Sequence, residues 1–251
     1  MRYRIAGQSH RGAVRKSNQD VVDWRVNDSG DQALLVVADG MGGYQGGEIA
    51  SRLAVDAVVE SLEPEISGPS SGKTVSSVRE SLERAFALAN ERILSRRAED
   101  AKLEKMGTTL VVAWVTGDRA HIAHIGDSRC YALQGRQAVC LTRDDTVVQS
   151  MLEDGSITEA DVPNVPFRNV LTRAVGAVEQ VQPSYRVESL EKGDVLLLCS
   201  DGLTHFVPEA RWLEILRESD GMERRAQAMI DAGLANEAGD NVSVVLLTLE
   251  Y

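Results

Sequence analysis

Leu34-Leu35-Val36-Val37-Ala38-Asp39-Gly40-Met41-Gly42-Gly43 is the stretch of sequence that decides the fold. An apolar run without polar alternation predicts a strand that is buried on both faces. The run ends by delivering one carboxylate, Asp39, into a glycine-rich turn, and Gly40 leaves its carbonyl free to approach a ligand closely. Asp-Gly is also a common turn pair, so a structural turn and a ligand-binding carboxylate are both open interpretations of this stretch alone.

The same pattern recurs at four further aspartates along the chain. Two of them follow apolar strand candidates and two precede one: Asp127, Asp201, Asp20 and Asp240. Because strand ends and strand starts alternate along one edge of an antiparallel sheet, we expect all five aspartates to share that edge. Crowded carboxylates repel one another unless a cation neutralises them. Oxygen ligands without nearby His or Cys favour Mg²⁺ or Mn²⁺ over Zn²⁺.

This set of ligands predicts a chemistry. Two ions that share Asp39 and the carbonyl of Gly40 would hold and deprotonate a water and polarise a phosphoryl group, which is the two-metal route to phosphoester hydrolysis. Arg15 lies on the loop that leads to Asp20, and a guanidinium binds phosphate through two parallel hydrogen bonds. A surface charge or a structural salt bridge with one of the aspartates is the competing role for Arg15.

Composition sets the class of protein. The chain has 251 residues with 43% hydrophobic content, enough for one large domain or two small ones. Its 38 acidic and 27 basic residues give a net charge of -11, which argues against nucleic-acid and anionic-membrane partners. The three cysteines, in or beside apolar runs, are interpreted as reduced core residues, and no signal or membrane-spanning segment is expected, so we expect a cytoplasmic protein.

Helical periodicity predicts helices from 46 to about 64, from about 78 to a charged tail at 96–105, and over 147–153, 208–218 and 222–234. The segment 142–181 breaks the succession of core strands and contains two prolines. It is interpreted either as a lid over the edge of the sheet or as an ordinary surface insertion.

Six motifs in order make the chain resemble the PPM-type metal-dependent protein serine/threonine phosphatases, the protein phosphatase 2C class, in its bacterial stand-alone form. They are Arg15 with Asn18-Gln19-Asp20, Asp39-Gly40-Met41-Gly42-Gly43 with Gly47-Glu48, Gly107-Thr108-Thr109, Gly126-Asp127-Ser128-Arg129, Ser200-Asp201-Gly202-Leu203, and Gly239-Asp240-Asn241. The resemblance implies an α+β fold, a four-layer α-β-β-α sandwich of two stacked antiparallel sheets flanked by helices. It further implies one catalytic domain over 1–251 with a flap-like insertion at 142–181.

The resemblance also implies roles for the aspartates. Asp39 resembles the bridging ligand of a binuclear Mn²⁺ or Mg²⁺ centre, with the Gly40 carbonyl on one ion. Asp201 and Asp240 resemble the ligands that complete this centre.

Three further roles follow from the resemblance. Asp20 resembles the carboxylate that holds a metal-bound water, and Asp127, with help from Asp201, resembles the ligands of a third, weaker metal site. Arg15 matches the phosphate-binding arginine, so Arg15 and Asp39 are the expected catalytic residues.

Two departures from the family pattern bear on catalysis. Met41 stands where eukaryotic relatives have a histidine proposed as general acid, and Asp145-Thr146 stands where relatives often show a histidine before Ser. The resemblance implies hydrolysis of phosphoserine and phosphothreonine by a bimetal-bound hydroxide, with a bacterial Ser/Thr kinase and its targets as partners. A phosphatase that restores a regulatory phosphoprotein is a related alternative, and a catalytically dead phosphoprotein-binding module is the alternative from another class.

Overall fold

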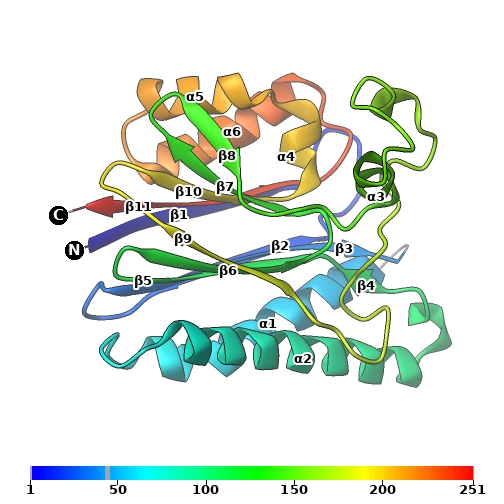
Figure 1. Ribbon diagram of the computed structural model, residues 1–251. Coiled ribbons are helices and arrows are strands. Elements are labelled where there is room, and N and C mark those ends of the chain that lie inside the picture. The colour runs from blue at the N-terminus through cyan, green and yellow to red at the C-terminus, as the bar shows by residue number, and fades with distance from the viewer. Residues whose placement is uncertain (1, 43–45, 251) are drawn as a thin grey trace.

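Two antiparallel β-sheets are stacked face to face in the computed structural model, which describes residues 2–42 and 46–250 (Figure 1). One sheet has the order β1 (Arg2–His10), β11 (Val242–Glu250), β10 (Val195–Cys199), β7 (Arg129–Gln134) and β8 (Gln137–Cys140). The other has the order β2 (Asp20–Val26), β3 (Gln32–Met41), β5 (Leu110–Thr116), β6 (Arg119–Ile125) and β9 (Ser184–Ser189), and the short β4 (Gly107–Thr108) pairs with the end of β3.

Strand β3 lies at the centre of this architecture. Its residues Leu34, Val36 and Ala38 pack toward the helices that cover its sheet, whereas the alternate residues, such as Leu35, pack against the second sheet. The apolar stretch from 33 to 38 has 0% exposure at every position. The prediction of a strand buried on both faces is therefore confirmed, because alternate side chains enter two different hydrophobic cores.

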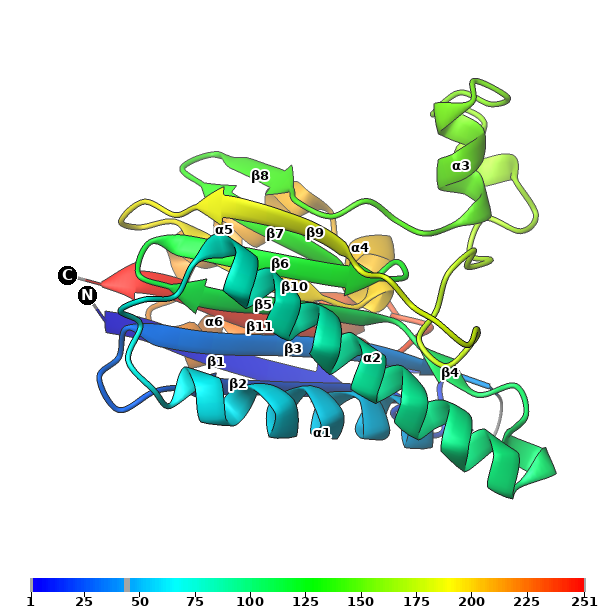
Figure 2. The same ribbon diagram turned by 60° about the horizontal axis from the view of Figure 1, so that its bottom comes forward.

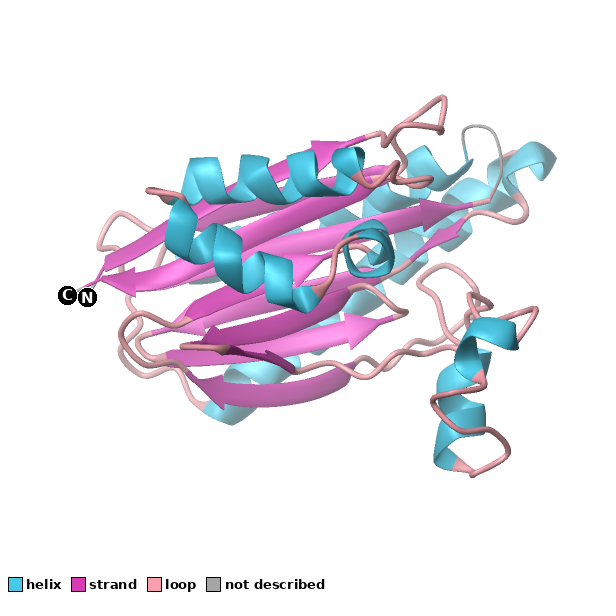
Figure 3. Cartoon of the chain, turned by 90° about the horizontal axis from the view of Figure 1, so that it is seen from above, coloured by secondary structure: helices cyan, strands magenta, loops and turns pink. Residues whose placement is uncertain are grey.

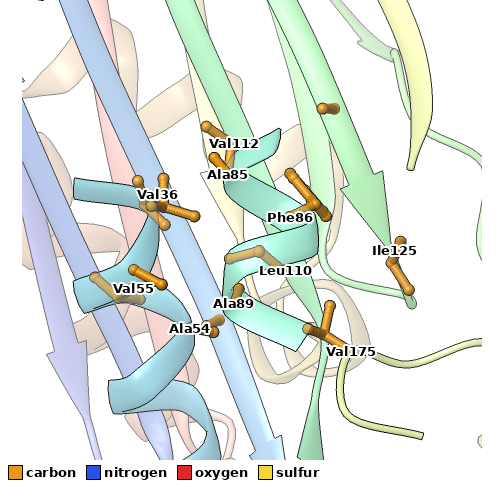
Figure 4. Packing of buried hydrophobic residues seen from close by; sticks show 14 of the residues in the cluster. Val36, Ala54, Val55, Ala85, Phe86, Ala89, Leu110, Val112, Ile125 and Val175 are labelled. Atoms are coloured by element: carbon orange, nitrogen blue, oxygen red, sulfur yellow. The ribbon is translucent and has the colours of Figure 1, made fainter. Parts of the chain in front are cut away.

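Helices cover both outer faces and complete the four layers. Helices α1 (Gly46–Ile66) and α2 (Val75–Glu99) cross the sheet that contains β3 (Figure 2). Small and aromatic side chains of these helices pack with β3 and β5 in one hydrophobic cluster, which includes Ala54, Phe86 and Val112 (Figure 4). Helices α5 (Glu209–Glu218) and α6 (Met222–Ala235) lie over the other sheet beside the short α4 (Asp201–Phe206) (Figure 3).

Several element boundaries differ from the sequence prediction. Helix α1 continues two residues past Pro64, because Ile66, at 2% exposure, packs into the core. Helix α2 begins at Val75 rather than about 78, because Thr74 forms a capping box with Ser77. Strand β9 and helix α4 were not predicted, since both are short and gain their place from neighbours rather than from a local pattern.

The interpretation of the three cysteines as core residues is partly wrong. Cys130 and Cys199 are buried, but Cys140 is exposed because it ends β8, the edge strand of its sheet. All three are free thiols.

The segment 142–181 leaves the sandwich at the end opposite the two termini (Figure 1). It contains helix α3 (Val147–Glu153), as predicted, and the 3-10 turn η2 (Val162–Asn164). None of the described residues of either element is buried. No helix in the described parts of the chain is long and apolar enough to cross a bilayer.

Candidate metal centre

A cleft of about 790 Å³ opens at the end of the sandwich from which the segment 142–181 projects. Four of the five predicted aspartates line it together with Arg15 and Gly40: Asp39, Asp127, Asp201 and Asp240. The expectation that one sheet edge carries all five aspartates is wrong in one respect. Asp20 and Asp39 belong to strands of the sheet of β3, Asp201 and Asp240 adjoin β10 and β11 of the other sheet, and Asp127 lies in the turn that connects the two sheets. The site is therefore built where the two sheets meet.

Asp20 and Asp39 lie directly opposite each other in the pairing of β2 with β3, as predicted for neighbours. Asp20 is buried at 5% exposure, and its Oδ2 accepts hydrogen bonds from Ser200 Oγ and Ser243 Oγ, each at 2.7 Å. Burial raises the pKa of Asp20 to about 7, although the two hydroxyl donors oppose the shift. Ionising Asp20 in this buried position therefore costs more free energy than ionising an aspartate in water.

Asp39 stands among the other carboxylates of the cleft, and the charges of Asp20, Asp201, Asp127 and Asp240 all act on it. Burial and the nearby charges, of which Asp20 is the strongest, raise the pKa of Asp39 well above its ordinary value. Burial also raises the pKa of Asp201, although nearby His205 opposes the shift. A cation bound beside these carboxylates would relieve their mutual repulsion.

Asp127 follows the left-handed residue Gly126, whose φ is 102°. A Cβ at this position would lie 2.7 Å from the side chain of Thr109, so only glycine allows the turn to approach β5 this closely. Burial, with the charges of Asp201 and Asp144 adding to it, raises the pKa of Asp127 to about 7. The turn thus directs a third electrostatically unfavourable carboxylate into the cleft.

Arg15 forms an ion pair with Asp240, at 2.7 Å between Nη2 and Oδ2. The two side chains are 51% and 33% exposed, so this pair lies at the mouth of the cleft. Both roles considered for Arg15 are compatible with this position, because a half-exposed guanidinium can exchange one anionic partner for another.

Gly40 has a packing role that the sequence did not indicate. A Cβ at Gly40 would lie 2.0 Å from the carbonyl oxygen of Gly47, in the first turn of α1. Its backbone N–H donates to Gln19 at 3.1 Å. The two glycines allow β3 and α1 to meet beside the cleft, and Gly43, which ends the quoted motif, lies outside the described residues.

Sequence reasoning missed the neutral groups that hold the aspartates. Asn241 accepts the N–H of Gln19 at 2.8 Å and donates to the carbonyls of Arg11 and Ser17. Thr109 Oγ1 accepts the N–H of Asp39 at 2.9 Å. Buried hydroxyls and amides within apolar strands were the available signal, since such groups are buried only with partners.

The chemistry of the residues present fits divalent cations. Among residues 2–42 and 46–250, no group of three or more His, Cys, Asp or Glu residues is already arranged to hold a metal ion. However, within those same ranges Asp20 Oδ1 and Asp201 Oδ1 are buried oxygens without a hydrogen-bond partner. Orphaned carboxylate oxygens beside mutually repelling carboxylates are the donors that hard cations select.

The chain resembles known proteins over almost its whole length. A family model described as protein phosphatase 2C matches residues 6–236. The serine/threonine phosphatase stp of Listeria innocua is 34% identical over 241 residues, covering 96% of this chain and 93% of that protein. The crystal structure of the Mycobacterium tuberculosis serine/threonine phosphatase PstP/Ppp superposes with a TM-score of 0.87 at 34% identity, covering 100% of both chains. A structure of the PstP catalytic domain in complex with two manganese ions has a TM-score of 0.83 at 33% identity, covering 98% of this chain and 97% of that one.

Proposed function

Since the chain belongs to the protein phosphatase 2C family and is a protein-serine/threonine phosphatase, we propose that Asp39, Asp201 and Asp240 hold two divalent metal ions for the hydrolysis of phosphoserine and phosphothreonine. The observation that carries this proposal is the cluster of buried and half-buried carboxylates with raised pKa values, two of which have a buried oxygen without a hydrogen-bond partner among the described residues. The manganese-bound PstP structure supports Mn²⁺ as one of the ions, and Mg²⁺ suits the same oxygen ligands.

The proposed roles of the ligands follow from their positions. Asp39, together with the carbonyl of Gly40, would hold the two ions, and Asp127 with Asp201 would hold a third, weaker ion. Asp20 orients a water beside the ions through Oδ1, because its Oδ2 is already occupied by two serine hydroxyls. When bound, the ions supply an activated water and polarise the phosphoryl group, so no covalent phosphoenzyme forms.

Arg15 is the proposed phosphate-binding residue. Its guanidinium stands at the mouth of the cleft, where it would exchange Asp240 for phosphate oxygens when the substrate arrives. Asp240 then loses its ion pair with Arg15. Arg15 orients the phosphoryl group, while Asp39 keeps the reacting centre beside β3.

The proposal also covers the substrates, the partners and the location of the protein. The substrates are phosphoproteins, and we propose a bacterial Ser/Thr kinase and its targets as partners. The phosphatase would reverse the reaction of this kinase. We also propose that residues 1–251 form one catalytic domain, with a flap at 142–181. Free thiols at all three cysteines favour a cytoplasmic location. The relatives carry phosphatase names, which gives no support to a catalytically dead binding module.

The test is hydrolysis of p-nitrophenyl phosphate and of a phosphothreonine peptide, with Mn²⁺ and after chelation, by the wild type and Asp39→Asn. The proposal expects Mn²⁺-dependent release of phosphate by the wild type and its loss in the variant. Activity that survives both chelation and the substitution would contradict the metal assignment.

A further inference from the structure

Asp145 is a buried carboxylate at the base of the segment 142–181, outside the lining of the metal cleft. Its exposure is 3%, and it accepts two charge-assisted hydrogen bonds. The N–H of Gly126 donates to Oδ2 at 3.0 Å, and Arg173 Nη1 donates to Oδ1 at 3.1 Å. Both carboxylate oxygens therefore have hydrogen-bond partners, and neither has a role in the proposed hydrolysis.

These two bonds join three parts of the chain that are distant in sequence. Asp145 begins the excursion of the segment, Arg173 ends it, and Gly126 belongs to the turn that carries Asp127. The backbone strengthens the junction, because the N–H of Asp145 donates to the carbonyl of Gly126 at 3.0 Å and the N–H of Thr172 donates to the carbonyl of Asp145 at 2.8 Å. Gly126 is thus held through both of its peptide groups by one residue.

The junction continues toward the bridging position of the cleft. Ser128, in the same turn, shares a hydrogen bond of 2.7 Å with Thr109 Oγ1, which also accepts the N–H of Asp39. Since Ser128 and Thr109 are only 1% and 2% exposed, water cannot replace the hydrogen bond between them when the Gly126 turn shifts. The position of Asp127 is coupled by direct contacts to the base of the segment.

A second set of contacts anchors the returning end of the segment. Arg173 also donates to Ser184 Oγ at 3.2 Å and to the carbonyl of Gln182. Asn90 of α2 accepts the N–H of Gly176 at 2.7 Å. These anchors keep the guanidinium directed toward Asp145, whose buried charge would otherwise lack a counter-ion.

We propose that Asp145 is a positioning residue that locks the Gly126–Asp127 turn and both ends of the segment 142–181 into one unit. Through this unit, the position of the segment on the sandwich determines how far the Asp127 carboxylate extends into the cleft. The consequence for metal binding rests on the proposed function, in which Asp127 holds the weaker ion. The lock itself is a property of the protein without metal.

The test uses Asp145→Ala and the isosteric Asp145→Asn, with Asp154→Ala and Asp154→Asn as matched controls. Asp154 lies in the same segment, but it is exposed, and its carboxylate accepts the N–H of the nearby Ser156. Asparagine has a single acceptor oxygen on its side chain, so Gly126 and Arg173 cannot both keep their bonds. Both Asp145 variants are measured, so the test survives if the alanine variant fails to fold.

The first measurement is amide hydrogen exchange in EDTA-treated protein. The proposal expects exchange at Gly126 N–H to accelerate at least about tenfold in Asp145→Ala, and exchange at Gly126 or at 172–173 to accelerate in Asp145→Asn. The Asp154 controls should match the wild type at these amides. Unchanged protection at Gly126 and 172–173 in both Asp145 variants would overturn the lock.

The second measurement is calorimetric titration with Mn²⁺, together with the Mn²⁺ dependence of kcat. The proposal expects the weakest Mn²⁺ affinity to fall about tenfold in the Asp145 variants, as when support of a metal ligand is removed. A lower Tm with unchanged Mn²⁺ affinity would show a merely structural role and overturn the coupling. Loss of the proposed function would appear instead as an inactive wild type, whatever the exchange and the calorimetry show.

Discussion

The aspartate cleft and the segment 142–181 lie at the same end of the sandwich but are held in different ways. The aspartates are fixed by strand register and by buried donors such as Ser243 and Thr109. The seven described residues of α3 include no buried one, and the segment is tied down only near its two ends. The comparison teaches that the fold gives the reacting centre a fixed geometry and leaves the neighbouring surface free to differ in sequence.

The largest effect should come from breaking the fixed region. Asp39→Asn removes the proposed bridging ligand and one of the repelling carboxylates. We expect Mn²⁺-dependent kcat to fall by at least about 10³-fold, beyond the roughly 10- to 100-fold typical of residues that only support a metal ligand. Thermal melting of the EDTA-treated variant should give a higher Tm than the wild type.

Asp23→Asn, on the neighbouring strand β2, is the matched control for that substitution. Its carboxylate pairs with Arg25 and lies three residues along β2 from Asp20. We expect kcat within about twofold of the wild type, as for a surface change. A loss comparable to that of Asp39→Asn would show that general damage to the sheet explains both results.

The same region should show a distinctive dependence on pH. The pKa values of Asp20 and Asp127 are raised to about 7, so the folded state binds more protons than the unfolded state above the ordinary value of 3.8. The free energy of unfolding of EDTA-treated protein should therefore decrease as the pH rises from about 4 to 7, by an amount on the order of a few kcal/mol.

Chemical denaturation at several pH values measures this decrease, and saturating Mn²⁺ should largely remove it. Asp31, whose pKa is lowered to about 2, acts in the opposite direction only below about pH 4. Stability that is flat from pH 4 to 7 after chelation would contradict the electrostatic description of the cleft.

Arg15→Ala probes the boundary between the two regions. Because the Arg15–Asp240 pair is substantially exposed, its loss should change the free energy of unfolding by less than about 1 kcal/mol. The KM for a phosphothreonine peptide should rise by about tenfold or more, while Mn²⁺ affinity changes little. Steady-state kinetics and calorimetry separate these effects, and the reverse pattern would make Arg15 a structural residue.

The smallest effect should come from the exposed part of the segment. Arg143→Gln removes an exposed ion pair with Glu153, which joins the start of the segment to α3. We expect a change in stability no larger than that of an ordinary surface substitution, and no change in KM. A large change in either quantity would mean that the exposed segment is as tightly coupled to the cleft as the strands are.

The sequence predicted what local patterns encode. The unbroken apolar run before Asp39 indicated a strand buried on both faces, and the repeated placement of aspartates at strand ends indicated one shared site. The two-sheet origin of that site could not be predicted, because it depends on how β10 and β11 stack on β3. The bonds of Ser200 and Ser243 to Asp20 were missed for the same reason, since they join residues about 180 and 220 positions apart.

The segment 142–181 also contains contacts that the sequence could not predict. Helix α3 was predicted from its local pattern, but the junction of Asp145 with Gly126 and Arg173 has no local signal. Charged residues are common in surface segments, and only the structure distinguishes the buried Asp145 from the exposed Asp154.

The most direct test of the central claim is the anomalous difference density of manganese in crystals of the protein grown with Mn²⁺. The account predicts two strong peaks in the cleft, both within coordination distance of Asp39, with Asp201 and Asp240 as further ligands. Peaks that avoid Asp39, or a cleft without manganese at saturating concentration, would contradict it.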